Sequence, residues 1–248
     1  MEAKKIEVGD IFSTNAGGEV EVVEYRGALE VVVKHLDKWG HEDVVQTDLL
    51  RKGVVKNPYK PSVFGKGFMG VGKYRASSAP SRQSPAYKAW VGLIRRTYEP
   101  SYLSSGRNIY GSTVCEEWHN FQNFAEWFYN EPNSDNPEFR LDKGMRVWGG
   151  RLYSPETCSY VPKCFHVWMT TKPRVSRELP RGVHPSGAKY LVMLNGDGRN
   201  NYLGTFETVA EAQEVYEYNL HKKYRQLAIE HCDEIHPEVY DNLMEFSS

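Results

Sequence analysis

The chain has 248 residues, 25% of them charged, and a formal net charge of −1; this length allows one large domain or two to three small ones. Aromatic residues make up 13% of the chain, which favours packed globular domains over disorder. The sequence shows no hydrophobic leader and no apolar run long enough to span a bilayer, so neither secretion nor membrane insertion is expected.

The charges are segregated along the chain although they nearly cancel in sum. Residues 51–110 carry a net charge of +11 and residues 140–189 a net charge of +7. Residues 1–50 and 111–139 each carry −6, and residues 190–248 carry −7. A near-neutral total argues against nucleic acid, but basic segments of this size predict a face that binds phosphates. The alternative is that acidic and basic segments fold against each other and cancel.

The N-terminal part of the chain predicts a β-rich module. Residues 20–25 and 30–34 are β-branched runs separated by Gly-containing turns, a pattern typical of a small barrel or curled sheet. Residues 50–85 follow as a basic connection rich in Gly, Pro and Ser. This connection is either an extended strap that lies along a phosphate backbone or a solvated linker.

Two helices are predicted in the middle of the chain, at residues 86–98 and 115–129, because apolar and aromatic side chains recur there every three to four positions. Lys88, Arg95 and Arg96 flank the apolar stripe of the first helix and are candidates for phosphate contacts. His119 lies on the second helix and is interpreted as incidental to function.

Residues 140–162 predict a compact strand, turn, strand and helix. A short strand is expected to end at Asp142 and Lys143, and a glycine pair at 149–150 marks a turn. Residues 154–156, Ser-Pro-Glu, predict a helix start, with Ser at the N-cap and Pro at the first helical position. An Asp at a strand end that faces a helix is typical of a small metal-dependent nuclease site.

This stretch resembles phage HNH homing-endonuclease-like proteins. The resemblance rests on three motifs that follow one another in the order found in that family. They are an aromatic pattern at 114–128 that begins Val-Cys-Glu-Glu-Trp, Leu-Asp-Lys at 141–143, and Tyr-Ser-Pro-Glu-Thr-Cys at 153–158. It covers about residues 54–163. Lys143 stands where the family carries a histidine general base, and the family's asparagine near the helix is not evident.

The resemblance implies a DNA endonuclease that hydrolyses phosphodiester bonds with Mg²⁺ or Mn²⁺, in the cytoplasm of an infected bacterial host. Asp142 would bind the metal, Lys143 would position the phosphate or stabilise charge, and Glu156 would complete the metal sphere. The alternative is structural: Asp142 and Lys143 form a turn-stabilising pair, and Glu156 caps a helix.

Residues 181–225 predict a second recognisable unit. Strands at 187–194 and 201–206 flank an Asn-Gly-Asp-Gly turn, and Thr208 begins a helix with Glu211 in capping-box spacing. This unit resembles the plant ethylene-response-factor type of DNA-binding domain, which implies a three-stranded sheet that enters the major groove and is backed by one helix. The matched residues are Gly182, Val183, Gly187, Leu203, Gly204, Thr205, Phe206, Thr208, Glu211, Ala212 and Tyr216.

The remaining features complete the prediction. Residues 226–248 predict an acidic helical tail broken at Pro237, and His221, His231 and His236 are interpreted as surface histidines. The four cysteines form no Cys-x-x-Cys pair, so free buried thiols of a cytosolic protein are expected and no structural zinc. The cysteines are Cys115, Cys158, Cys164 and Cys232.

Together these patterns predict an α+β protein of three modules: a small β-barrel-like module at 1–53, an HNH-like core with its basic strap at 54–170, and a sheet-plus-helix DNA-binding module with a helical tail at 181–248. The partner is double-stranded DNA. The alternatives are a catalytically inactive DNA-binding factor, or a phage protein that inhibits a host factor through its acidic modules. The candidate DNA-binding residues are Lys88, Arg95, Arg96, Arg140, Arg146, Arg151, Arg181, His184, Lys189, Tyr190 and Arg199.

Overall fold

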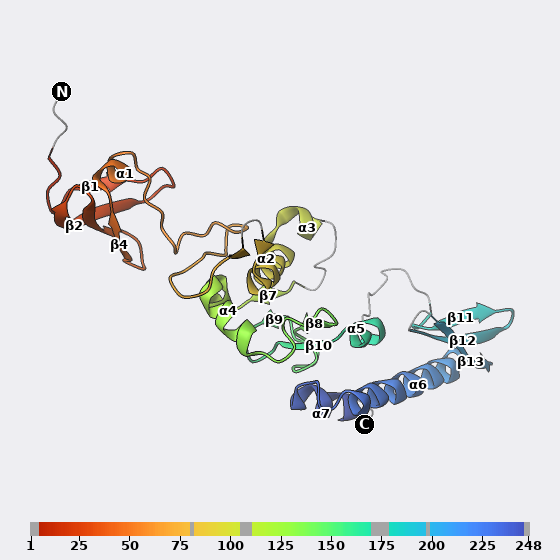
Figure 1. The fold of residues 1–248 in the computed structure, drawn as a ribbon. Helices are drawn as coiled ribbons and strands as arrows, with labels where there is room; N and C mark the ends of the chain where they lie inside the picture. The colour runs from red at the N-terminus through yellow and green to blue at the C-terminus, as the bar shows by residue number, and fades with distance from the viewer. Residues whose placement is uncertain (1–4, 80–81, 105–110, 170–178, 197–198, 246–248) are drawn as a thin grey trace. The chain divides into compact units, whose positions relative to one another are not determined.

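The computed structural model describes residues 5–79, 82–104, 111–169, 179–196 and 199–245 and has the α+β composition expected from the sequence (Figure 1). The chain divides into two compact units, residues 1–73 with 120–122, and residues 74–119 with 123–248. Among the described helices, none is both long enough and apolar enough to cross a membrane.

The first unit contains an open antiparallel sheet. Its strands are β1 (Ile11–Ser13), β2 (Glu19–Gly27), β3 (Glu30–His35) and β4 (Glu42–Val45), in that spatial order, followed by the short helix α1 (Thr47–Arg51). The meander does not close, so the module is a curled sheet rather than a barrel. Alternating side chains of the strands fill its core, which consists of Ile6, Val20, Val22, Val31, Val33, Val45, Leu50 and Val55, with Phe12 packed against it.

Part of the predicted basic strap is anchored to this sheet. Residues 54–73, which the sequence assigned to the central module, group with the first unit. The Asp37 carboxylate in the β3–β4 turn accepts hydrogen bonds from the Trp39 amide at 2.9 Å and the Asn57 side-chain amide at 2.7 Å. The Trp39 ring stacks on Tyr59 with a centroid separation of 5.0 Å. These contacts hold residues 57–59 against the turn, so that stretch is neither an extended strap nor a solvated linker.

In the second unit the predicted first helix is confirmed as α2 (Pro85–Tyr98), preceded by the paired strands β5 (Ser77–Ala79) and β6 (Arg82–Gln83) and followed by α3 (Pro100–Ser104). The Ser84 hydroxyl caps α2 by accepting the Tyr87 amide at 3.3 Å. The second predicted helix is divided into a 3₁₀ turn (Glu116–His119) and α4 (Phe121–Asn130). Buried Trp90 of α2 donates its indole N–H to the Trp118 carbonyl at 2.7 Å, which fixes α2 to that turn.

A strand–strand–helix unit is present, but its second strand and its helix both lie later in the chain than predicted. β8 (Phe139–Asp142) pairs antiparallel with β10 (Ser159–Pro162), and α5 (Lys163–Met169) follows β10 directly. The short strand β9 (Leu152–Tyr153) instead pairs in parallel with β7 (Thr113–Val114).

The helix expected from Ser154 onward is therefore wrong. The Ser154 carbonyl accepts the Thr157 and Cys158 amides at 3.3 and 3.0 Å, which closes a single turn. The chain then continues into β10, whose four residues are all buried. Burial of this run against β8 prevails over the local Ser-Pro-Glu signal, because that signal favours only the first turn of a helix.

The predicted C-terminal sheet-plus-helix unit is confirmed. Strands β11 (Val183–Ser186), β12 (Lys189–Gly196) and β13 (Arg199–Phe206) form an antiparallel sheet beside α6 (Val209–Glu230), and α7 (Pro237–Glu245) packs on α6 near its end (Figure 1). Both capping-box hydrogen bonds between Thr208 and Glu211 are present, at 3.2 and 3.3 Å. The core of this unit also includes Met145, Val161 and Phe165, so it is continuous with the β8–β10 region.

Gly182, just before β11, gives a test of this packing. Its φ is +76°, and a Cβ there would lie 2.2 Å from two Tyr216 ring atoms and 2.7 Å from the Met193 carbonyl oxygen. Gly187 has a φ of +63° with no described atom within 4 Å of its Cβ position, so it is a matched control for backbone strain. We expect Gly182→Ala to lower the free energy of unfolding by about 3 kcal/mol and Gly187→Ala by about 1 kcal/mol, measured by urea denaturation. Equal losses would contradict the packing of Tyr216 against this turn.

Candidate functional site

The β8–β10 hairpin and α5 bring a carboxylate and an imidazole together. Asp142 is the last residue of β8, and His166 lies in the first turn of α5. The Nδ1 atom of His166 is 4.0 Å from Oδ2 of Asp142, which is an electrostatic contact longer than a hydrogen bond. The strand–strand–helix connection thus places an acid beside a histidine that the sequence analysis did not select.

The other oxygen of Asp142 holds the loop that follows β8. Oδ1 accepts the Gly144 amide at 2.7 Å and the Met145 amide at 2.8 Å. Such an Asx turn fixes the carboxylate plane, because both donors belong to the backbone. Asp142 therefore has one oxygen committed to structure and one oxygen directed at His166.

Burial favours the neutral form of His166. Desolvation lowers the pKa of this imidazole, and the nearby negative charge of Asp142 opposes the shift without reversing it. Its Nε2 atom is buried and has no hydrogen-bond partner among the described residues. A neutral imidazole with an unused nitrogen has the chemistry of a general base.

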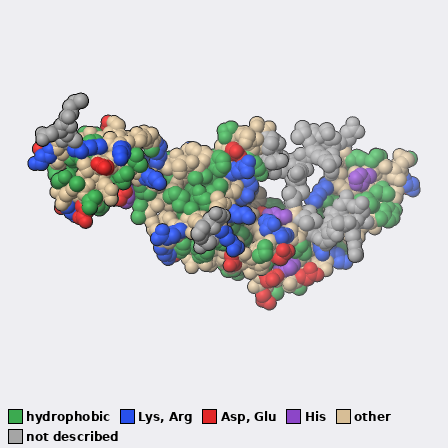
Figure 2. Space-filling model, turned by 45° about the horizontal axis from the view of Figure 1, so that its top comes forward, with side chains coloured by type: hydrophobic (Ala, Val, Ile, Leu, Met, Phe, Trp, Pro, Cys, Tyr) green, Lys and Arg blue, Asp and Glu red, His purple; other side chains and the backbone are tan. Residues whose placement is uncertain are grey.

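His166 lines a cleft that also receives three cationic side chains. Lys88 and Arg96 come from α2 and Arg140 from β8, and all three residues are exposed. The cleft has a volume of about 690 Å³, which is within the range of ligand-binding clefts. Figure 2 shows Lys and Arg side chains gathered beside histidine on the second unit. Asp135 is the acidic residue among the lining side chains, so positive charge prevails in the cleft.

The cleft cations are oriented by their neighbours. Nη1 of Arg140 donates to the carbonyls of Pro137 and Phe139 at 3.0 and 2.9 Å. Burial raises the pKa of Tyr153, another lining residue, and the charge of Arg96 together with its hydrogen bond opposes the shift. Both guanidinium groups are thus held at the cleft rather than extended into solvent.

The two other predicted catalytic residues point elsewhere. Nζ of Lys143 donates to the Gly150 carbonyl at 3.2 Å and lies 5.5 Å from the Tyr153 ring centroid. Glu156 is exposed in the turn before β10, and a hydrogen bond from Ser154 lowers its pKa. Their observed contacts are structural, and their proposed roles in catalysis stay predictions.

Asp142 fits a metal ion that keeps most of its water molecules. Within the described ranges, no three His, Cys, Asp or Glu side chains are grouped closely enough to hold a metal. Mg²⁺ is commonly bound through one or two carboxylates, several waters and substrate phosphates, so a dedicated cage is not required. The free lone pairs of the Asp142 carboxylate suit such a role.

Several of the predicted DNA-binding residues make internal contacts. Arg95 pairs with Glu99 at 2.6 Å on α2. The side chain of Arg146 is 13% exposed, and its guanidinium donates to Glu238 at 2.8 Å and to the carbonyls of Pro155 and Cys158 at 2.8 and 3.1 Å. Arg146 is thus a structural residue at the centre of the second unit. Arg151 is exposed.

The C-terminal sheet presents few cations on its described surface. His184 is exposed on β11, whereas Lys189 forms an ion pair with Glu207. Tyr190 packs against the hydrophobic core of this unit, and the charge of Arg181 acts on Tyr224 of α6. The side chain of Arg199 lies outside the described residues. Among its described residues, this sheet therefore carries less positive charge than the cleft between α2 and β8.

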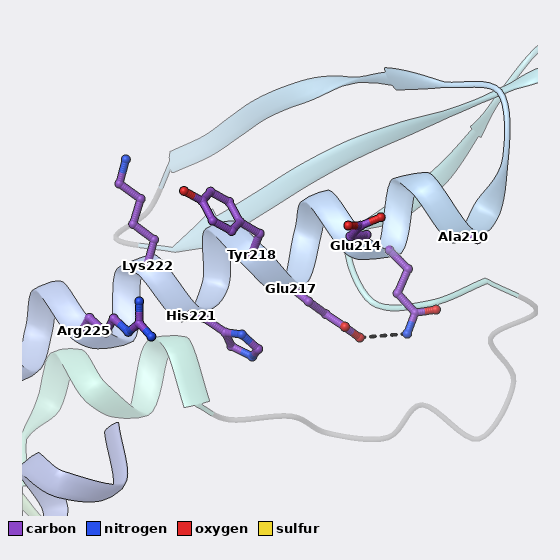
Figure 3. Close-up of a pocket in the computed structure, with 8 residues that line it drawn as sticks. Ala210, Glu214, Glu217, Tyr218, His221, Lys222 and Arg225 are labelled. Atoms are coloured by element: carbon purple, nitrogen blue, oxygen red, sulfur yellow. Dashed lines mark hydrogen bonds between the residues drawn. The ribbon is translucent and has the colours of Figure 1, made fainter. Parts of the chain in front are cut away.

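A second hollow lies along α6 and contains both signs of charge (Figure 3). Gln213 donates to Glu217 at 2.8 Å in its lining, and Tyr218, Lys222 and Arg225 extend from the same helix. The acids Glu214 and Glu217 lie toward one end of this stretch and the bases Lys222 and Arg225 toward the other, so it does not present the uniform positive field of the first cleft.

Comparison with known proteins gives no assignment: the chain matches no protein-family model, no curated protein and no solved structure. The site must therefore be interpreted from its own geometry.

His166 could have been identified from the sequence if the helix start had been placed correctly. A helix beginning at Lys163, directly after a buried strand, puts His166 in its first turn. The Ser-Pro-Glu signal at 154–156 favours a helix start upstream of Lys163, so the sequence does not place His166 near the beginning of a helix.

Arg146 provides a test of how the loop after Asp142 is held. Replacing it by Met leaves the two carbonyls and Glu238 without their donor, so we expect Arg146→Met to lower the free energy of unfolding by about 3 kcal/mol. Glu238→Gln is the matched control, because Glu238 is exposed and the backbone contacts of Arg146 remain. Thermal and urea unfolding would measure both variants. Equal stability losses would show that the surface ion pair, rather than the buried carbonyl contacts, carries the interaction.

Proposed function

We propose that the chain binds double-stranded DNA through the cleft between α2 and β8 and cleaves its phosphodiester backbone, as a phage-type, HNH-like endonuclease. The observation that carries this proposal is the convergence of Lys88, Arg96 and Arg140 on the cleft that His166 lines, with Asp142 beside that histidine. Concentrated positive charge attracts the phosphate backbone, and a half-buried acid–histidine pair supplies proton transfer.

The three cations bind phosphates in complementary ways. Lys88 acts as a point charge, whereas the guanidinium groups of Arg96 and Arg140 can each donate two N–H groups to one phosphate. Arg140 loses little conformational entropy on binding, because backbone carbonyls already hold its guanidinium. These contacts position the backbone without reading sequence.

His166 and Asp142 carry the chemistry. The neutral imidazole accepts a proton from the water that attacks the phosphorus atom, and the negative charge of Asp142 stabilises the imidazolium that results. Asp142 would also hold the divalent ion, Mg²⁺ or Mn²⁺, which supplies charge neutralisation at the phosphate when bound. Lys143 and Glu156 support the loop geometry in this scheme.

The resemblance to phage HNH homing-endonuclease-like proteins supports the proposal, because Leu-Asp-Lys and Tyr-Ser-Pro-Glu-Thr-Cys stand in that family's order. The C-terminal sheet and α6, which resemble the ethylene-response-factor type of domain, would add a second DNA contact through His184 and Lys189. By the same resemblance, the protein would act in the cytoplasm of an infected bacterial host.

A second candidate function is DNA binding without cleavage. It is favoured by the contacts of Lys143, which stands at the family's histidine position but donates to the Gly150 carbonyl. In that case the basic cleft and the C-terminal sheet would serve a regulatory factor.

The binding part of the proposal is tested with a neighbouring pair of arginines. Arg96 lines the cleft, whereas Arg95 is paired with Glu99 on the same helix. We expect Arg96→Gln to weaken binding to a duplex and to reduce the slope of log affinity against log salt by about 0.9, because one phosphate contact is lost. Arg95→Gln should leave the slope unchanged. Fluorescence anisotropy over a salt series measures the affinity and the salt slope of each variant. If the two variants behave alike, the DNA does not bind at the cleft between α2 and β8.

The cleavage part is tested by nicking of supercoiled plasmid with Mg²⁺ or Mn²⁺. We expect Asp142→Asn and His166→Asn each to reduce nicking by about 100-fold or more, because each removes one partner of the proton-transfer pair. His221→Asn on α6 is the control histidine variant and should cleave normally. Unchanged cleavage in the two site variants would refute the assignment. Salt-sensitive binding without nicking by the unaltered protein would favour the second candidate.

A further inference from the structure

A cysteine, a histidine and a glutamate form a hydrogen-bonded chain outside the cleft. His231 follows the last residue of α6, and its Nδ1 atom lies 2.5 Å from Oε2 of Glu234. On the other side of the ring, Nε2 of His231 lies 3.6 Å from Sγ of Cys164, in the first turn of α5. Cys164, His231 and Glu234 are thus linked in space as a nucleophile, a base and a carboxylate that orients the base. This arrangement activates cysteine nucleophiles.

The hydrogen bond to Glu234 determines which nitrogen of His231 is available. A carboxylate accepts, so Nδ1 carries the proton, and in the neutral ring Nε2 is left as an acceptor. The thiol of Cys164 is the donor within reach of that acceptor. Transfer of the thiol proton to Nε2 produces a thiolate beside an imidazolium, which the Glu234 carboxylate stabilises.

The site is held from several directions rather than formed by loose surface side chains. The His231 amide donates to the Leu227 carbonyl at 3.1 Å and the Glu234 amide to the His231 carbonyl at 2.9 Å, which fix the turn after α6. The side-chain amide of Asn133 donates to the Glu234 carbonyl at 3.3 Å. The buried Phe165 ring lies 5.6 Å from the His231 ring, centroid to centroid. These contacts limit rotation of the imidazole.

The other cysteines have different environments. Cys158 is fully buried, and burial raises its pKa to about 12, so it remains a thiol at neutral pH. Burial also raises the pKa of Cys115. Cys232 is exposed, and Cys164 is half-buried. Accessibility alone would therefore favour reaction at Cys232, whereas the neighbouring base His231 favours reaction at Cys164.

We propose that Cys164 is a reactive thiol site that hydroperoxides oxidise to a sulfenic acid, with His231 as its acid–base partner and Glu234 as the residue that positions His231. The thiolate sulfur attacks the terminal peroxide oxygen, an S–O bond forms and the O–O bond breaks. Cysteine is oxidised by two electrons, and the hydroperoxide is reduced to an alcohol, or to water in the case of hydrogen peroxide. The proton on His231 goes to the leaving oxygen.

The test treats the full-length protein with limiting hydrogen peroxide in the presence of dimedone, which traps sulfenic acids, and locates the adduct by peptide mass spectrometry. At pH 6 we expect the adduct at Cys164 to form about tenfold faster than at Cys232, because His231 lies within reach of the Cys164 thiol and can accept its proton. The far-ultraviolet absorbance of thiolate should fall in Cys164→Ser.

Two carboxylate variants distinguish the specific contact of Glu234 with His231 from a general effect of negative charge near the site. Glu234→Gln should reduce both the thiolate absorbance and the adduct rate at Cys164 several-fold, because a neutral amide no longer stabilises the imidazolium that pairs with the thiolate. Asp233→Asn removes an equal charge from the adjacent exposed position and should change neither. The proposal is overturned if Cys232 reacts as fast as Cys164, or if the two carboxylate variants behave alike.

Discussion

The guanidinium of Arg146 connects the loop after Asp142 to the C-terminal helices, and the candidate site depends on this connection. Two loop carbonyls and Glu238 of α7 share its donors. Asn242 of α7 adds hydrogen bonds to the Met145 and Arg146 carbonyls at 2.8 and 2.9 Å. A long loop loses considerable conformational entropy when it is ordered, and buried polar contacts with few alternative partners offset that cost here. The direction of the Asp142 carboxylate is thus set partly by residues near the end of the sequence.

The chemistry of the cleft follows from continuity between a strand and a helix. β10 is buried over its whole length, and α5 starts without an intervening loop, so the position of His166 is fixed by the pairing of β10 with β8. The same pairing fixes Asp142. The acid and the histidine therefore share one rigid support, whereas the cations of α2 reach the cleft from a separate helix. In the proposed function, α2 would thus add two phosphate-binding cations to a β8–β10–α5 unit that carries Arg140, Asp142 and His166.

The sequence predicted the elements whose signals are local and periodic. The apolar face of α2 and the capping box of Thr208 and Glu211 are examples, because each involves residues within a few positions of one another. The start of α5 was missed, since a Ser-Pro-Glu turn resembles a helix start and the burial of β10 depends on distant β8. The burial of Arg146 was missed for the same reason: its partner Glu238 is remote in sequence. Arg96 and Arg140 were selected from charge, but nothing local indicated that they share a cleft while Arg95 does not.

The hydrogen bonds from Asn242 have a practical consequence for how loss of activity should be interpreted. A nonsense mutation shortly before α7 would spare every residue of the cleft and the whole C-terminal sheet. It would nevertheless remove both the Asn242 amide and the Glu238 carboxylate, and so release the loop that orients Asp142. A bulky C-terminal fusion that disturbed the packing of Val239 or Leu243 would act in the same way. Mutations that abolish the function of the site would then map to the last helix, although the side chains of this helix contact the loop at Met145 and Arg146 and do not line the cleft.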